Sequence, residues 1–305
     1  MKTDVRPPAR WKPDHLFLLG PDYHLGDLLW FTAVLAEYRK RVAPRRVFVG
    51  VPDRAISRIL ERNPLVDRLL YGDARAAVAQ ARCRPDGGLE VHDLRPLAVA
   101  GAMVRDWRYR LPWLYYRDLW LEPRGQWLAT YLRLGPLQEF RPLLGLYDDD
   151  FDAARALPAR YVALAPHVGQ YSLPLASALW ERLKGWPPEN WAALAEALRR
   201  AGFEPVTLGA PGQVPIEGTT PMIGLPIRQA AGVIDRAAAL ISVESGLWFI
   251  AAARQTPFVI VPWWLPRSVN WPAPMRVPHR LVYRDAASVQ AVLSHVCELV
   301  PHAAS

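Results

Sequence analysis

The sequence predicts an α/β protein with two similar halves that face each other across a cleft. Short apolar runs alternate with segments of helical periodicity, which is the pattern of open, doubly wound parallel sheets. A strand, a tight turn and a helix follow one another at Leu16–Leu29 and again at Ile241–Ala253. Such a turn aims backbone N–H groups and the positive end of a helix at one point, where a diphosphate can bind. At 305 residues the chain is long enough for two α/β domains.

The first half contains four predicted strands with helices between them. Apolar residues recur at nearly helical spacing after Asp27, and Asn63-Pro64 ends the next helix. The predicted strands are His15–Leu19, Arg46–Val51, Val66–Tyr71 and Gly88–Val91, and the predicted helices are Asp27–Lys40, Ala55–Arg62 and Ala74–Ala81.

Residues 104–135 differ in composition, because eight Trp and Tyr residues are interleaved there with six Arg residues. Basic residues with Trp suit a membrane headgroup region. The same segment could bind an anionic acceptor such as a phosphorylated lipid-linked sugar, or form ordinary helices with core aromatics. The acidic run Asp148–Asp150, with Asp152, is interpreted as a linker. We therefore predict two domains, residues 1–150 and 151–305.

The second half repeats the alternation of strands and helices. Pro187-Pro188 precedes one helix and Gly202 follows it, as expected of helix ends. The predicted strands are Tyr161–Ala165, Pro205–Leu208, Leu240–Val243 and Phe258–Val261, the last of the core, and the predicted helices are Trp191–Ala201, Arg228–Ala238, Gly246–Arg254 and Ala287–Leu299.

The composition is globular, with 51% hydrophobic and 22% charged residues, which argues against disorder. The net charge of +8 suits nucleic acid, an anionic membrane face or a phosphorylated small substrate. Cys83 and Cys297 have no paired spacing, so we expect neither a zinc site nor a disulfide framework, which fits a reducing cytoplasm. Met1–Lys12 lacks the apolar core of a secretory signal. No apolar run approaches the ~18 residues of a membrane-spanning helix, so any membrane contact would be peripheral.

Five short motifs follow one another along the chain. They are Gly26-Asp27-Leu28-Leu29, Asn63-Pro64-Leu65-Val66-Asp67, Val91-His92-Asp93-Leu94-Arg95, Lys184-Gly185-Trp186-Pro187 and Val243-Glu244-Ser245-Gly246, the last continuing to Ala253. In this order they resemble the motifs of glycosyltransferase family nine, the ADP-heptose:lipopolysaccharide heptosyltransferases and their relatives. The resemblance implies a GT-B fold, in which two Rossmann-like domains face each other across the active cleft. It also implies inverting transfer from a nucleotide sugar without metal or cofactor, with the acceptor on residues 1–150 and the donor on residues 151–305.

Asp27 opens a predicted helix directly after a strand and a glycine. Inverting transfer requires a base near the acceptor hydroxyl, for which one carboxylate suffices. The resemblance implies that Asp27 is this base. The alternative is that Asp27 caps the helix, a common role of aspartate. His24 and Gly26 lie in the same turn and either face the acceptor or shape the turn.

The donor is expected on residues of the second half. The resemblance implies that Lys184 offsets the charge of the leaving diphosphate, with Arg182 as second choice. Ser245 and Gly246 would contact the diphosphate through hydroxyl and backbone N–H groups, and Glu244 would hold the sugar. The alternatives are a solvated lysine and a simple helix cap.

His167 follows the first strand of the second half, and Gly209 begins a glycine-rich turn, so both are further donor candidates. His167 could equally only terminate its strand. Trp263 and Trp264 follow the last predicted strand, where ligands of open α/β sheets bind, although packing is the alternative. Val243 and Phe249 stand where the family has Asn and His, and these departures speak against heptose as the sugar more than against the fold.

We therefore expect a bacterial glycosyltransferase that moves a sugar, heptose or another, from a nucleotide-diphosphate donor to a glycan or glycolipid in surface polysaccharide or lipopolysaccharide synthesis. We expect it in the cytoplasm, with peripheral contact to the anionic inner membrane face as an option. Nucleic acid is not an expected partner, because no nucleic-acid motif accompanies the charge. The alternatives are a sugar-nucleotide epimerase or hydrolase on the same fold, and a non-catalytic binding or scaffold protein.

Overall fold

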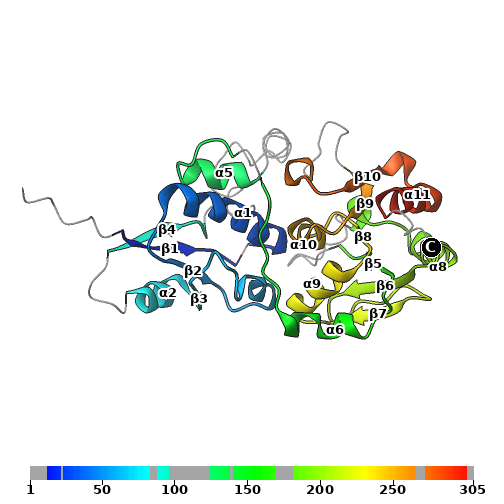
Figure 1. Cartoon of the computed structure of the whole chain (residues 1–305), viewed down its shortest axis with the longest axis horizontal. Coiled ribbons are helices and arrows are strands. Elements are labelled where there is room, and N and C mark those ends of the chain that lie inside the picture. Colours follow the sequence, from blue (N-terminus) through cyan, green and yellow to red (C-terminus); the bar gives the residue numbers. More distant parts are fainter. Residues whose placement is uncertain are drawn as a thin grey trace, which may run out of the picture.

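The computed structural model describes residues 12–21, 23–82, 88–95, 124–137, 140–168, 181–264 and 272–300. It contains two parallel sheets that form two lobes (Figure 1). The first sheet has the strand order β3-β2-β1-β4, and the second has the order β10-β9-β8-β5-β6-β7. Within these residues every strand pairs in parallel, which confirms the predicted α/β class with two doubly wound halves.

The first lobe follows the predicted order of elements. They are β1 (Asp14–Leu18), α1 (Leu25–Val42), β2 (Val47–Val51), η1 (Ala55–Leu60), β3 (Arg68–Tyr71), α2 (Ala74–Ala81), β4 (Leu89–Asp93) and α5 (Arg124–Tyr131). The prediction of a helix over Ala55–Arg62 needs one correction, because η1 is a short 3-10 helix that ends before Asn63-Pro64. Of the aromatic and basic segment 104–135, residues 104–123 lie outside the described part of the chain.

The second lobe contains the predicted elements and two further strands. Its elements are β5 (Tyr161–Ala165), α8 (Pro188–Arg200), β6 (Glu204–Gly209), β7 (Thr220–Ile223), α9 (Ile227–Arg236), β8 (Ala239–Ser242), α10 (Leu247–Arg254), β9 (Phe258–Trp263), β10 (His279–Tyr283) and α11 (Val289–Leu299). Phe258–Val261, predicted as the last core strand, lies in the fully buried β9, and a further strand that the sequence did not indicate, the partly exposed β10, pairs beyond it. β7 and β10 are the two edge strands and are only partly buried, so neither shows a continuous apolar run.

Each sheet reverses its strand order once, and these two points lie beside the predicted site residues. In the first sheet the chain moves from β1 through β2 to β3 and then returns to place β4 on the other side of β1. In the second sheet it moves from β5 through β6 to β7 and returns to place β8 on the other side of β5. Open α/β sheets bind ligands outside the carboxyl ends of their strands at such switch points.

The two lobes share an apolar core. One buried cluster contains Phe31 and Leu35 of α1 together with Trp248 and Ala252 of α10. In Figure 1 α1 and α10 lie at the junction of the lobes, between the two sheets. Contact between the lobes is therefore made by two helices whose first turns carry predicted site residues.

A connecting strap, residues 140–147, runs between the lobes (Figure 1). Side chains of both lobes hold its backbone: Thr32 Oγ1 accepts from Leu143 N at 2.9 Å, and Arg228 Nη2 donates to Gly145 O at 2.8 Å. The strap leads into η4 (Asp148–Phe151) and α6 (Asp152–Arg155), which pack on α9. The acidic run is thus folded onto the second lobe, while the boundary at residue 150 stays a prediction.

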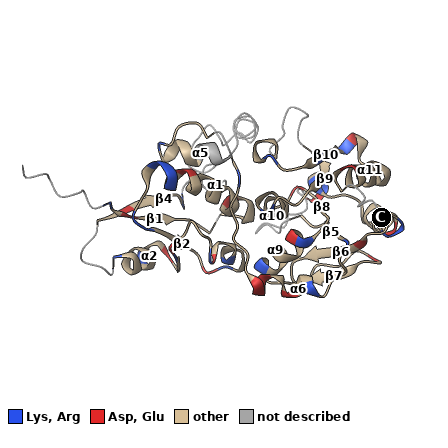
Figure 2. Cartoon of the chain, in the orientation of Figure 1, with Lys and Arg blue, Asp and Glu red and all other residues tan. Residues whose placement is uncertain are grey.

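Both signs of charge occur on both lobes among the described residues (Figure 2). No helix in that part of the chain combines the length and apolar character needed to cross a bilayer.

Candidate functional site

The first turns of α1 and α10 pack directly against each other. A Cβ atom added to Gly26 would lie 2.8 Å from Cε2 of Phe249, and one added to Gly246 would lie 2.8 Å from Cβ of Leu25. Glycine at both positions is what allows this close approach. The two strand–turn–helix units predicted from the sequence therefore meet at one place.

Two positive helix ends converge at this junction, and two carboxylates lie beside them. Each helix start carries a partial positive charge from its unpaired N–H groups. Asp27 lies in the first turn of α1, and Glu244 lies just before α10. These carboxylates offset the positive ends of the helices, and an anionic group such as a diphosphate could take the place of that charge.

Asp27 is the third residue of α1 and closes a capping box with His24, which is the N-cap residue in place of Asp27. Its Oδ2 accepts a hydrogen bond from the backbone N–H of His24 at 3.0 Å, and the residue is only 7% exposed. The cap fixes the carboxylate at the junction of the lobes. A capping role and a role as base are compatible, so the structure leaves Asp27 as a candidate base. His24 itself is exposed at the start of the turn.

Lys184 and Glu244, both predicted to bind the donor, are in contact. Lys184 Nζ forms an ion pair with Glu244 Oε2, and the two side chains are only 10% and 12% exposed. The Trp264 ring lies 5.9 Å from the same Nζ. Arg182, the second choice for this role, is exposed. The neighbouring Trp186 is buried against Trp191 of α8 at 5.2 Å between ring centroids, which anchors the backbone next to Lys184.

Ser245 and Gly246 begin α10 as predicted. Ser245 Oγ lies 3.0 Å from Ser242 Oγ and 3.4 Å from Leu247 N, so its hydroxyl sits beside the first N–H groups of the helix. Gly246 is the N-cap residue. This is the arrangement of a helix cap, and it also presents hydroxyl and N–H groups in the manner of an anion site.

His167 and Gly209 lie at the carboxyl ends of β5 and β6, at the same sheet edge as Glu244. His167 Nε2 is 2.9 Å from Val214 O, so the ring holds the loop that follows β6. A Cβ added to Gly209 would lie 2.6 Å from Cδ1 of Ile223, so any larger residue there would have to displace that side chain. Both residues have structural roles at this edge, and their contact with a donor stays a prediction.

Phe249, which departs from the family pattern, is part of the contact between the lobes. It stacks on Trp248 with ring centroids 3.7 Å apart and meets the edge of Trp30 at 5.6 Å. Trp263 is 1% exposed and belongs to the core, whereas Trp264 lies beside Lys184. Trp30 was not predicted as part of this contact. In the sequence an apolar residue at a contact between lobes looks the same as an apolar residue of the core.

Comparisons with known proteins agree with this geometry. Residues 169–261 match the family described as glycosyltransferase family 9 (heptosyltransferase), and a search of curated proteins gave no match. A glycosyltransferase family 9 structure from Veillonella parvula aligns with a TM-score of 0.67 and 13% identity, covering 95% of this chain and 97% of that one. E. coli ADP-heptose LPS heptosyltransferase II aligns with a TM-score of 0.67 and 17% identity, covering 94% and 98%. E. coli heptosyltransferase WaaC with ADP gives 0.57 and 15%, covering 94% and 99%. Residues 169–261 are thus similar to glycosyltransferase family 9, and the described structure has the GT-B fold of the solved heptosyltransferases.

Proposed function

We propose that this protein is an inverting glycosyltransferase that moves a sugar from a nucleotide-diphosphate donor to a hydroxyl of a glycan or glycolipid. The observation that carries the proposal is the meeting of the α1 turn, with Asp27, and the α10 turn, with the Lys184–Glu244 pair beside it. A donor of the ADP-heptose type is the first choice, because WaaC, which has the same fold, was solved with ADP.

In this proposal Asp27 removes the proton of the acceptor hydroxyl while that oxygen attacks the anomeric carbon. The bond between the anomeric carbon and the diphosphate oxygen breaks on the opposite face of the sugar, which inverts the configuration. Negative charge then builds on the leaving diphosphate. The Lys184 ammonium and the N–H groups at the start of α10 offset it.

Lys184 must exchange partners for this to happen. Without donor, its ammonium is neutralised by Glu244. When the diphosphate arrives, Lys184 turns to the phosphate oxygens, and the Glu244 carboxylate is released to accept hydrogen bonds from sugar hydroxyls. The ion pair thus keeps both groups in the site before the donor binds.

A thermal-shift screen against nucleoside diphosphates and sugar nucleotides tests donor binding. A ligand that binds only the folded state raises the unfolding temperature, and the increase grows with the ratio of ligand concentration to Kd. We expect a shift with ADP and ADP-sugars, and a smaller one with uridine or guanosine diphosphates. A folded protein that responds to none of these compounds would favour the non-catalytic alternative. Turnover of a sugar nucleotide without acceptor would favour the epimerase or hydrolase.

The Asp27→Asn variant tests the base. Its amide oxygen can still accept from the His24 N–H, so the helix cap and donor binding should survive. Loss of a general base should lower turnover by about 10²- to 10⁴-fold. Asp73→Asn is the matched control, since Asp73 caps α2 by accepting from Ala76 N at 2.7 Å. Near-normal turnover of Asp27→Asn would remove Asp27 as the base.

A further inference from the structure

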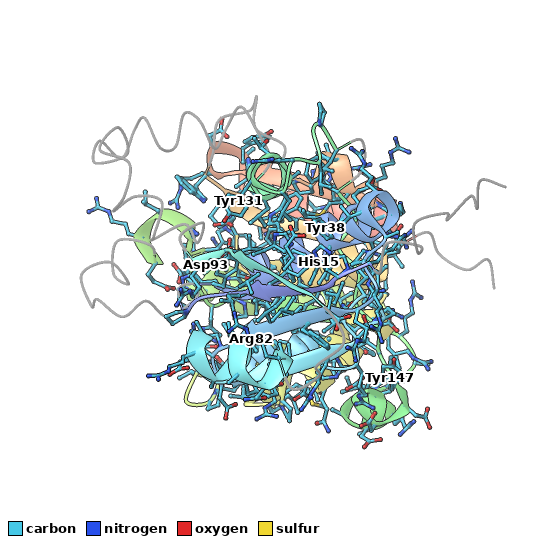
Figure 3. All side chains as sticks on the ribbon, turned by 90° about the vertical axis from the view of Figure 1, so that its left-hand side faces the viewer. His15, Tyr38, Arg82, Asp93, Tyr131 and Tyr147 are labelled. Atoms are coloured by element: carbon cyan, nitrogen blue, oxygen red, sulfur yellow. The ribbon has the colours of Figure 1, made fainter. Side chains whose placement is uncertain are left out.

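A cluster of metal-ligating side chains lies in the first lobe, away from the proposed transfer site. His15 on β1 and Glu90 on β4 are paired in register, and His92 follows two residues later on β4, so all three share one face of the sheet. Tyr38 of α1 covers this face. Figure 3 shows His15 and Tyr38 next to each other. Tyr38 lies eleven residues after Asp27 on α1, which separates the cluster from the transfer site by roughly 16 Å.

Four side chains direct nitrogen or oxygen atoms at a common point. His15 Nδ1 lies 3.0 Å from His92 Nε2, and Tyr38 Oη lies 2.8 Å and 2.9 Å from these two nitrogens. The Glu90 carboxylate lies 3.7 Å from His15 Nδ1 and 3.5 Å from His92 Nε2. The donor atoms of a tetrahedral zinc site lie about 3.3 Å apart, because each bond is about 2.0–2.2 Å long. The observed separations bracket this value.

The three short contacts are compatible with two arrangements. In the first, the Tyr38 hydroxyl accepts from the N–H of one imidazole and donates to the lone pair of the other, so hydrogen bonds satisfy all three groups. The two facing nitrogens, 3.0 Å apart, then have no hydrogen bond left for each other. In the second, a cation between them engages both lone pairs and the oxygens at once.

The surroundings hold both imidazoles in place. Phe17 stacks on His92 at 4.7 Å and meets Tyr38 edge-on at 5.1 Å, which fixes the rings. Glu90 is 55% exposed at its side chain and gives an ion access from solvent.

We propose that His15, His92 and Glu90 bind a divalent transition-metal ion of the zinc type, with the Tyr38 hydroxyl as the fourth donor. Two imidazoles with a carboxylate form a ligand set that zinc accepts. The ion would join β1, β4 and α1 and stabilise the first lobe. The proposal does not depend on the transferase activity, because the cluster lies outside the transfer site.

Metal titration of the untagged full-length protein tests the site. After removal of metal by a chelator, we expect one equivalent of Zn²⁺ to bind and to raise the unfolding temperature as its concentration increases. Co²⁺ should bind with the visible absorption of a tetrahedral complex. His92→Ala and Glu90→Gln, which change the two less buried ligands, should abolish or strongly weaken binding. Tyr38→Phe should weaken it by about 10- to 100-fold.

His295→Ala is the matched control, because His295 and Glu298 form a similar pair on the surface of α11, with Nδ1 3.3 Å from the carboxylate. This variant should bind Zn²⁺ as the wild type does. Circular dichroism of each metal-free variant must match the metal-free wild type. The proposal is overturned if the wild type binds no stoichiometric Zn²⁺, or if binding survives both His92→Ala and Glu90→Gln in folded protein. Either result would leave the cluster as a hydrogen-bonded core network.

Discussion

Lys184 and Glu244 form a buried ion pair in addition to the donor-binding role proposed for them, and a single substitution would disturb both. About nine-tenths of each side chain is removed from solvent. Removing one partner of a buried pair leaves the other charge without compensation, which costs about 3–5 kcal/mol. Loss of activity in Lys184→Met alone would therefore not show that Lys184 binds the diphosphate.

The double variant Lys184→Met/Glu244→Gln separates the two roles. It removes both charges, so the free energy of unfolding should recover much of what each single variant loses. Donor binding should stay lost, because the diphosphate has no ammonium to meet. Urea unfolding gives the stability, and the thermal shift with the best nucleotide gives the binding. Donor binding that returns with stability in the double variant would show that Lys184 is only structural.

At the scale of single residues the sequence could predict positions but not contacts. Lys184 and Glu244 were both expected in the donor site from local motifs, yet nothing in the sequence pairs them across 60 residues. Asp150 reads as part of a solvated acidic run, but it is 3% exposed and bonded to Arg228. A charged residue can be buried when a partner from a distant part of the sequence pairs with it. The residues next to Asp150 in the sequence therefore do not predict its burial.

At the scale of elements, the contact between α1 and α10 depends on glycine, which has no side chain, at Gly26 and Gly246. A methyl group on Gly26 would overlap the ring of Phe249, which is held by Trp248 and Trp30. Overpacking of this kind costs about 1–3 kcal/mol. Alanine also has a higher helix propensity than glycine by about 1 kcal/mol, which partly hides that cost in a single variant.

A double-mutant cycle of Gly26→Ala with Phe249→Leu cancels the difference in helix propensity between glycine and alanine. That difference is the same whether or not Phe249 is replaced. We expect a coupling energy of about 0.5–3 kcal/mol, because the smaller side chain gives the methyl group room. Gly88→Ala is the control, as the nearest atom to its added Cβ is 3.9 Å away. Urea unfolding measures all variants. A coupling energy near zero would mean that the two helix starts do not touch in solution.

The elements themselves were largely predictable because most of them bury one face or both. β5 is buried along its whole length, and its predicted bounds are those observed. β7 and β10 were missed for the opposite reason: as edge strands they are partly exposed, and Thr220–Ile223 includes a proline. The site edge depends on β5, β6 and β8, which lie inside the sheet, and so its position could be predicted.

At the scale of the whole molecule, Arg228 joins both lobes and the strap. From α9 it donates to Glu61 O of the first lobe at 2.6 Å, to Gly145 O of the strap at 2.8 Å, and to the Asp150 carboxylate. The guanidinium therefore links three separate parts of the chain through one buried side chain. Its fixed fork of N–H groups suits this better than a lysine would.

Arg228→Met should therefore weaken the coupling between the lobes as well as total stability. The variant leaves the buried Asp150 carboxylate with only the exposed Arg62, at 3.5 Å, as a cation, and it removes the donor of Glu61 O, which should cost about 3–5 kcal/mol. Arg62→Met is the control, because Arg62 pairs with Asp149 of the same acidic run at 2.8 Å with side chains 44% and 63% exposed, and lies farther from Asp150. An exposed pair contributes about 0–1 kcal/mol. In calorimetry we expect one unfolding transition for the wild type and for Arg62→Met, and two separate transitions for Arg228→Met. If Arg228→Met unfolds in one transition with the midpoint of Arg62→Met, the lobes are held together by the α1–α10 contact, and the strap only connects them.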